Sequence, residues 1–147
     1  MHHEKELAAG AIIFRKEDKR ILYLVLFKRR WKYWEIGIKG HIEQGETEID
    51  AIKREAREET GIVNLRFIPG FREKIEYTYV LDNKRIHKIV FFKLAETTQK
   101  NIKLSSEHIA YAWLPYEEAF KILTHREMRE VLRKAHNYLR KLGIIQN

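Results

Sequence analysis

The apolar positions of this 147-residue chain fall into short runs separated by polar turns, a pattern that predicts several β-strands. Residues 7–14 and 21–29 are nearly continuous apolar runs, as in buried strands, and the polar turn Lys16-Glu17-Asp18-Lys19 joins them. Residues 31–39 are aromatic without a regular period and predict an irregular segment. Further strands are expected at residues 62–68, 71–80, 86–95 and 110–114. The turn Asp82-Asn83-Lys84 would make the second and third of these a hairpin.

A helix is expected between the strands, and both of its ends carry recognisable signals. Thr47 and Asp50 have the spacing of a capping box at the start of the helix. Gly61 suits the left-handed residue that follows a helix, so that Ile62 can fold back onto Ala56. The apolar face that this helix turns toward the core is made by Ile49, Ile52 and Ala56.

Two more helices are expected near the C-terminus, at residues 116–123 and 126–142. The second has an apolar stripe at helical spacing, formed by Met128, Val131, Leu132, Ala135, Tyr138, Leu139 and Leu142. Strands, a helix, strands and then helices predict an α+β fold with one helix on a mixed sheet. The length is that of a single domain, residues 1–147.

Composition narrows the class of protein. Cysteine is absent, which excludes a disulfide framework, a thiolate nucleophile and a Cys-based zinc site. No apolar run approaches the roughly 18 residues that span a membrane, and the N-terminal segment lacks a secretory apolar core. We therefore expect a soluble cytoplasmic protein without a membrane partner. The 34% of charged residues and the lack of cysteine are typical of thermophiles.

The net charge of +8 favours an anionic ligand, and nucleotides, RNA and acidic membrane surfaces all meet that condition.

The strongest chemical signal is a group of carboxylates near the end of the central helix. At about 100° per residue, Glu58 lies about 60° to one side of Glu55, and Glu59 lies about 40° to the other. Like charges on one narrow arc repel each other and destabilise a helix. Bound cations would compensate them, and hard divalent ions with carboxylate ligands indicate Mg²⁺ or Mn²⁺ and phosphate chemistry. The alternative is an ordinary solvated face of charged side chains.

The segment from Gly40 to Ile62 fits the spacing of the Nudix box, G-x5-E-x7-R-E-U-x-E-E-x-G-U. Its fixed positions are filled by Gly40, Glu46, Arg54, Glu55, Glu58, Glu59, Gly61 and Ile62, with Ala56 at the first apolar position. The chain thus resembles the Nudix hydrolases, which cleave nucleoside diphosphates linked to another group. The resemblance implies an α/β/α sandwich and divalent-metal-dependent attack of water on phosphorus.

The Nudix resemblance also implies roles for the box residues. Glu55 and Glu59 would be metal ligands, and Glu58 would be a ligand or would position water. Arg54 would orient Glu55 through a bidentate contact, while the carbonyl of Gly40 would face a metal. Glu46 is expected to brace the loop.

The resemblance extends beyond the box to the asymmetric diadenosine tetraphosphate hydrolases of animals and archaea. It is carried by residues 9–15, 39–41, 69–77, 88–92, 104–108, 112–114 and 117–119. This family implies hydrolysis of a dinucleoside polyphosphate to ATP and AMP. It also implies that Glu107 joins the metal site and acts as general base. Tyr77 would stack on an adenine, and phosphate contacts are expected from Lys39, His41, Lys88 and Arg29.

One segment departs from the family pattern. Where the family often has His-His-Trp before its box, this chain has Lys32-Tyr33-Trp34. Lys32 would supply positive charge and Tyr33 a stacking face in place of the histidines. Trp31, Trp34 and Trp113 are expected to be packing residues.

Two alternatives stay open. The same chemistry could act on another nucleotide, namely 5′-triphosphate RNA, a nucleoside triphosphate or a dinucleotide cofactor. A non-catalytic nucleotide-binding or RNA-binding module is the other alternative, although it would not need the complete carboxylate set. The oligomeric state is not predicted.

Overall fold

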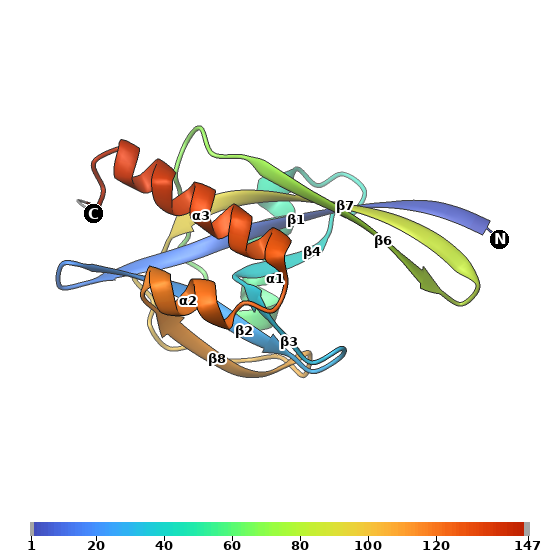
Figure 1. The fold of residues 1–147 in the computed structure, drawn as a ribbon, viewed down its shortest axis with the longest axis horizontal. Helices are drawn as coiled ribbons and strands as arrows, with labels where there is room; N and C mark the ends of the chain where they lie inside the picture. The colour runs from blue at the N-terminus through green and yellow to red at the C-terminus, as the bar shows by residue number, and fades with distance from the viewer. Residues whose placement is uncertain (1, 146–147) are drawn as a thin grey trace.

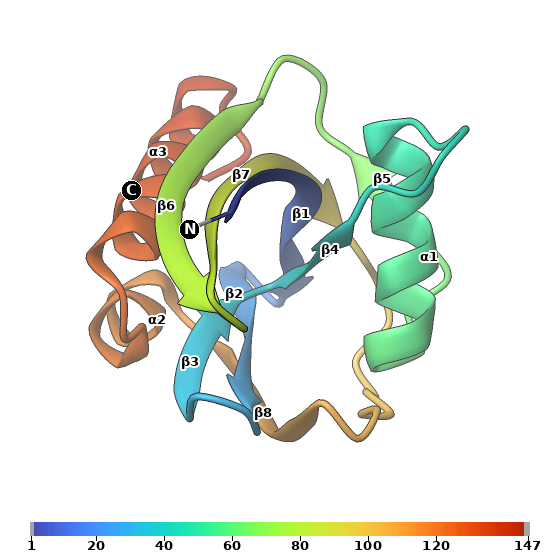
Figure 2. The same ribbon diagram turned by 90° about the vertical axis from the view of Figure 1, so that its right-hand side faces the viewer.

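The computed structural model describes residues 2–145, whose strands form one mixed sheet. The strands are β1 (His2–Glu17), β2 (Arg20–Lys28), β3 (Tyr33–Ile36), β4 (Ile38–His41), β5 (Arg66–Phe67), β6 (Glu73–Leu81), β7 (Lys84–Glu96) and β8 (His108–Leu114). The helices are α1 (Glu48–Thr60), α2 (Tyr116–Ile122) and α3 (Arg126–Lys141). Figures 1 and 2 show α1 on one face of the sheet and the C-terminal helices on the other. The α/β/α sandwich expected from the resemblance is therefore confirmed.

Strand β1 organises the sheet because it pairs with three other strands. It runs parallel to β7 in the register Ala8↔Val90 and antiparallel to β2 and β4. The pair Ala9↔Gly40 places the end of β4 beside the middle of β1. The first half of β1 and the β6–β7 hairpin extend beyond the helices as an arm (Figure 1).

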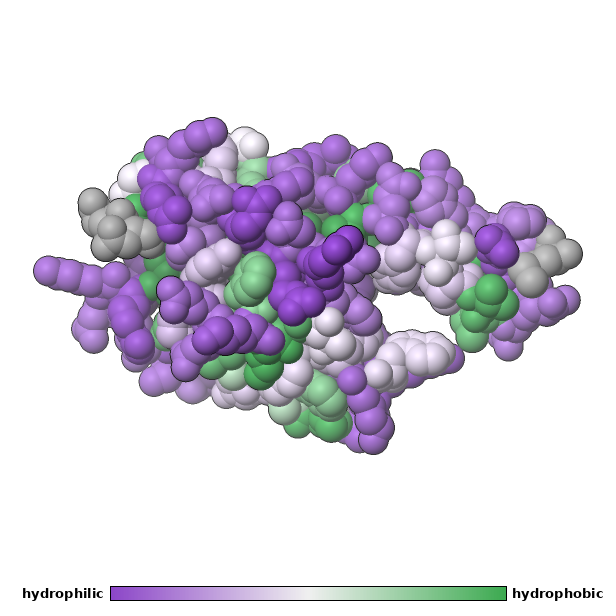
Figure 3. Space-filling model, in the orientation of Figure 1, coloured by the Kyte–Doolittle hydropathy of each residue, from purple (hydrophilic) through white to green (hydrophobic). Residues whose placement is uncertain are grey.

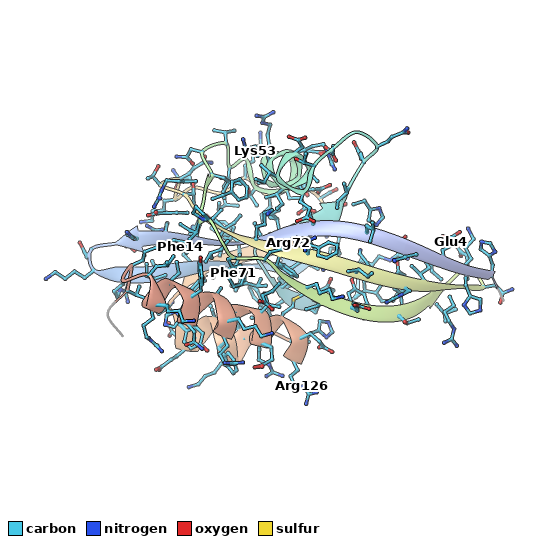
Figure 4. The ribbon with its side chains drawn as sticks, turned by 90° about the horizontal axis from the view of Figure 1, so that it is seen from above. Glu4, Phe14, Lys53, Phe71, Arg72 and Arg126 are labelled. Carbon is cyan, nitrogen blue, oxygen red and sulfur yellow. The ribbon has the colours of Figure 1, made fainter. Side chains whose placement is uncertain are left out.

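Two apolar cores lie on opposite faces of the sheet, because side chains along a strand point alternately to either side. One core packs beneath α2 and α3 and includes Phe14 and Phe92. The other packs beneath α1 and includes Ala51, Ile52 and Ile62. Figure 4 shows the layers edge-on, with Lys53 on the outer side of α1 and Arg126 at the start of α3.

The ends of α1 are built as the sequence predicts. The backbone N–H of Asp50 donates to Thr47 Oγ1 at 3.1 Å, and the N–H of Thr47 donates to Asp50 Oδ2 at 3.0 Å. Gly61 is left-handed (φ 75°), and its N–H donates to the carbonyl of Arg57. Ile62 is buried in the same core as Ala56. These contacts fix where the acidic end of α1 lies relative to the sheet.

Some predicted elements differ from the structure. Residues 31–39 are not irregular throughout, since β3 and β4 lie there, separated by Gly37 (φ 59°). A Cβ atom at Gly37 would lie 1.8 Å from the carbonyl oxygen of Ala11, so the close approach to β1 needs glycine.

The expected strand at residues 62–68 is reduced to Arg66–Phe67. Ile62 is buried in the core beneath α1, while Val63 and Asn64 are exposed and hydrogen-bond to Gln99 and Thr98 instead of pairing in the sheet. Leu142 ends the predicted stripe of α3 but is 48% exposed beyond the helix.

Within residues 2–145, no helix is long and apolar enough to cross a membrane.

Candidate active site

A cleft of about 1110 Å³ lies between the acidic end of α1 and the β1–β6–β7 arm. Figure 3 shows the surface deeply notched beneath the arm. Most of the residues predicted for the site line this cleft: Tyr33, Lys39, Gly40, His41, Arg54, Glu55, Glu59, Tyr77, Lys88 and Glu107. Glu58 does not line it, and its side chain is 55% exposed beside Arg54.

Gly40 is required by the carboxylate of Glu55. A Cβ atom at Gly40 would lie 2.2 Å from Cδ of Glu55, well inside van der Waals contact. The absence of a side chain therefore lets the backbone of β4 lie directly against a carboxylate of α1. Burial raises the pKa of Glu55, and the neighbouring Arg54 guanidinium opposes that change.

Arg54 binds the loop between β4 and α1, residues 42–47, which we call the box loop. Its bidentate contact is with Glu46, through Nε at 2.8 Å and Nη2 at 3.1 Å, and not with Glu55 as expected. Glu55 receives one hydrogen bond from Nη1 at 2.7 Å, and the same nitrogen donates to Glu58 at 3.1 Å. Glu46 accepts from the Nε and Nη2 edge of the guanidinium, which leaves Nη1 for Glu55 and Glu58.

Glu46 also accepts a hydrogen bond from the backbone N–H of Glu43 at 2.8 Å. The expectation that Glu46 braces the loop thus agrees with its contacts. Arg54 Nη2 completes the brace by donating to the carbonyl of His41.

Glu59 and Glu107 bring two carboxyl groups together at the floor of the cleft. Glu59 is only 5% exposed. Burial, together with a hydrogen bond to Glu107, raises the pKa of Glu59 to about 10. The same hydrogen bond lowers the pKa of Glu107, so the two carboxyl groups titrate as a coupled pair. Two ionised carboxylates in contact repel each other, and a cation bound between them would offset that repulsion.

The carboxylates fit a divalent metal site by their chemistry. Glu59 Oε2 is buried without a hydrogen-bond partner among the described residues, and such an oxygen is costly unless something binds it. Carboxylate and carbonyl oxygens are the ligands that Mg²⁺ and Mn²⁺ prefer. As the side chains of residues 2–145 stand, no group of three or more acidic or histidine side chains is arranged to hold a metal ion. A divalent ion held at this place by three carboxylates would require at least one of Glu55, Glu58 and Glu107 to turn from its present partner.

Sequence reasoning missed a buried ion pair beneath the cleft. Glu35 is 2% exposed, and its carboxylate accepts from Lys39 Nζ at 2.9 Å and contacts His108 Nε2 at 2.6 Å. Burial alone would raise the pKa of Glu35, but the Lys39 ammonium and His108 hold it at about 2. Lys39 Nζ also donates to the Tyr33 hydroxyl at 3.0 Å. The network joins β3, β4 and the start of β8, directly beside Glu107.

Basic and aromatic groups form the opposite wall. Tyr77 is 36% exposed on β6, and Lys88 is half-buried on β7, directly opposite it in register. Burial and the charge of Lys39 lower the pKa of Lys88. His41 Nε2 lies 3.5 Å from the carboxylate of Glu6 on β1. Arg29 lines the cleft, but its Nε donates to the carbonyl of Ser106, so it anchors the loop that carries Glu107.

The tryptophans separate into two kinds. Trp34 packs on Phe27 with ring centroids 5.2 Å apart, and Trp113 lies under Arg15 while its indole N–H donates to the carbonyl of Lys100. Trp31 is 67% exposed at the mouth of the cleft. The expectation that all three are packing residues is therefore wrong for Trp31, because the β2–β3 turn carries it away from both cores.

Comparison with known proteins bears on what such a cleft does. The model of the NUDIX domain family matches residues 4–135. A Mus musculus protein named bis(5′-nucleosyl)-tetraphosphatase [asymmetrical] is 36% identical over 142 residues, covering 90% of this chain and 94% of the mouse protein. The Sus scrofa protein of the same name is 35% identical with the same coverage.

Among solved structures, the binary complex of a C. elegans Ap4A hydrolase superposes with a TM-score of 0.75 at 30% identity. The superposition covers 91% of this chain and 97% of the C. elegans chain. The likeness therefore extends well beyond the α1 segment.

Proposed function

The chain belongs to the Nudix family, and on that premise we propose that it hydrolyses diadenosine tetraphosphate asymmetrically, giving ATP and AMP. The relatives that cover nearly the whole chain carry that activity in their names. The proposed cofactor is Mg²⁺, with Mn²⁺ as the other candidate.

The arrangement of opposite chemistry in one cleft carries the proposal. Its floor is acidic, with Glu55, Glu59 and Glu107, and its other wall is basic and aromatic, with Lys88 and Tyr77. A nucleotide polyphosphate has matching parts, because cations can bridge its phosphates to the carboxylates while its bases stack on aromatic rings. The cleft is also large enough for a ligand of more than drug size.

The proposed metal ligands are Glu55, Glu58, Glu59, Glu107 and the carbonyl of Gly40. When bound, divalent ions would neutralise the polyphosphate and lower the pKa of a water molecule. Arg54 would orient Glu55 through the contact at 2.7 Å, while Glu58, which now accepts from the same nitrogen at 3.1 Å, would turn toward the metal ion. The brace between Arg54 and Glu46 keeps the backbone of the box loop fixed while the carboxylates turn.

The remaining residues would handle the substrate and the proton. Glu107 would accept the proton of the attacking water. Lys88 and Lys39 would face the phosphates, with His41 at the edge of the cleft. Tyr77 would stack on one adenine, and Tyr33 would hold Lys39 through its hydroxyl.

Product analysis in ¹⁸O-labelled water tests the proposal directly. The protein with Mg²⁺ and diadenosine tetraphosphate should release equal amounts of ATP and AMP, one of them carrying a single ¹⁸O atom. Excess chelator should abolish turnover. Glu59→Gln should lose at least a hundredfold in kcat, whereas Tyr111→Phe, on an exposed strand position outside the cleft, should be unaffected. Two ADP molecules, or no turnover, would contradict the proposal.

The net charge of +8 keeps 5′-triphosphate RNA as the second candidate substrate. A higher kcat/KM for such RNA than for diadenosine tetraphosphate, with steep salt dependence, would favour it. Nucleotide binding without metal-dependent hydrolysis would favour a non-catalytic module.

A further inference from the structure

The tip of the β2–β3 turn presents an indole ring where the backbone disfavours one. The pair Lys28↔Tyr33 closes the turn, which leaves Arg29 to Lys32 as the loop. Trp31 (φ 71°) and Lys32 (φ 50°) are both in the left-handed region. Bulky residues rarely adopt that conformation, and glycine or asparagine would serve the turn better. The turn therefore gives no reason for a tryptophan at position 31.

Solvent exposure gives no reason for it either. Trp31 is 67% exposed, so most of its apolar ring is uncompensated by packing. The Arg30 guanidinium carbon lies 5.0 Å from the ring centroid and covers one face. A largely exposed ring with a cation over it resembles a stacking platform.

The turn faces the aromatic wall of the cleft. Residues 28–33 all line the cleft, as do Tyr77 and Tyr79 from β6. Burial and a hydrogen bond from the Tyr79 hydroxyl to Glu6 raise the pKa of Tyr79 to about 12. The positive charge of Arg30 acts on the same hydroxyl and opposes that increase. Tyr77 and Tyr79 are neighbours, with ring centroids 6.1 Å apart. Two aromatic surfaces thus border one cleft, with the carboxylates at its floor.

The charges around Trp31 indicate what would stack on it. Lys28, Arg29, Arg30 and Lys32 lie close to Trp31 in sequence and line the same cleft, and Arg30 lies over the ring. Aromatic rings among Lys and Arg residues are typical of sites for nucleobases next to phosphate. An apolar protein partner or a lipid tail would not need four cations here.

We propose that Trp31 is a base-stacking subsite that binds the second base of a two-base substrate, while Tyr77 binds the first. The inference rests on the proposed function and deepens it, because it makes Trp31 the residue that distinguishes dinucleotides from mononucleotides. Arg30 supports the subsite by holding one face of the indole.

A comparison of two substrates tests the subsite. Diadenosine tetraphosphate has two bases, and adenosine 5′-tetraphosphate has one. Trp31→Asn removes the ring and suits the left-handed backbone, so its melting temperature should equal or exceed that of the parent. Its KM for the two-base substrate should rise about tenfold more than its KM for the one-base substrate, as expected for the loss of one stacked base. Trp31→Phe keeps a ring and should recover most of the difference.

Fluorescence separates this inference from the proposed function. In a Glu59→Gln background, which prevents turnover, diadenosine tetraphosphate should quench tryptophan emission, and Trp31→Asn should remove most of the quenching. This experiment reports on Trp31 even if the parent protein does not hydrolyse the dinucleotide. Equal changes in KM for both substrates, unchanged KM for the two-base substrate, or quenching that persists without Trp31 would each overturn the inference.

Discussion

Glu59 is the residue at which burial and negative charge oppose each other most strongly. Its side chain is almost fully buried, and one of its oxygens has no hydrogen-bond partner within the described structure. Its carboxyl group contacts a second carboxyl group, that of Glu107. Without a bound cation, such a site destabilises the fold. Stability and function thus conflict at this position.

We expect Glu59→Gln to raise the melting temperature in excess chelator while abolishing hydrolysis. The folded-state pKa of about 10 lies above the ordinary value of 4.5, so the parent loses stability as pH rises from about 4.5 toward 10. The variant lacks this titration, and its advantage should therefore grow between pH 5 and pH 9. Calorimetry at both pH values measures the effect.

Glu58→Gln is the matched control. Because Glu58 is largely exposed, this substitution should leave the melting temperature in excess chelator nearly unchanged. A Glu59→Gln protein less stable than the parent at pH 9 would contradict the argument.

The Glu35–Lys39 pair is a second residue-scale case, and both side chains are almost fully buried. We expect Glu35→Gln to cost about 3–5 kcal/mol of unfolding free energy, because it leaves a buried ammonium without its counter-charge. The double variant Glu35→Gln/Lys39→Met should recover much of that loss. Urea unfolding of the two variants measures both terms.

The exposed pair of Glu130 and Arg133 supplies the comparison, since Glu130→Gln should have little effect. If Glu35→Gln were equally mild, the buried pair would not hold β3 to β4.

At the scale of elements, local signals were the most predictable. The capping box, Gly61 and the α3 stripe depend on neighbours within one or two helical turns, so their spacing in sequence is sufficient. The Asp82-Asn83 hairpin turn is equally local, and both residues are left-handed, as a two-residue hairpin loop requires.

Elements that depend on distant partners were not predictable. Glu35 lies in an aromatic segment without a regular period, and only β4 and His108 make its burial tolerable. Tryptophan is large and apolar, so the sequence predicts a core position for Trp31, and only the shape of the β2–β3 turn exposes it. Residues 62–65 were predicted as part of a strand, but Val63 and Asn64 hydrogen-bond to side chains of residues 97–99, which are distant in sequence. The roles of the individual glutamates in metal binding remain predictions of the family resemblance.

The N-terminal cap of α1 gives a prediction at this scale. Thr47→Ala removes the side-chain acceptor for the Asp50 N–H, which should cost about 1 kcal/mol and lower the melting temperature by about 2–4 °C. Thr47→Ser keeps the hydroxyl and should restore stability. Thermal unfolding of the two variants decides the point, and an equal loss in both would mean that the threonine methyl group, not the cap, matters.

At the scale of the whole molecule, the charge of +8 should act on the encounter with an anionic substrate. We expect kcat/KM for diadenosine tetraphosphate to fall as ionic strength rises from about 0.05 to 0.5 M, since salt screens the attraction. The value of kcat at saturating Mg²⁺ should change little. Steady-state kinetics in KCl and in a tetramethylammonium salt would distinguish screening from specific ion effects. A kcat/KM that does not change with ionic strength would contradict long-range attraction.

The parallel pairing of β1 with β7 sets an order of events in folding. Ala8 and Val90 are adjacent in the sheet but about 80 positions apart along the chain. Closing so long a loop is slow, and β1 cannot complete its hydrogen bonds until β7 has been synthesised. Ribosome-bound chains that end before residue 84 should therefore show no hydrogen-exchange protection in residues 2–6, which pair only with β7. During synthesis, the strand that later forms the centre of the molecule therefore keeps an open edge until β7 has emerged.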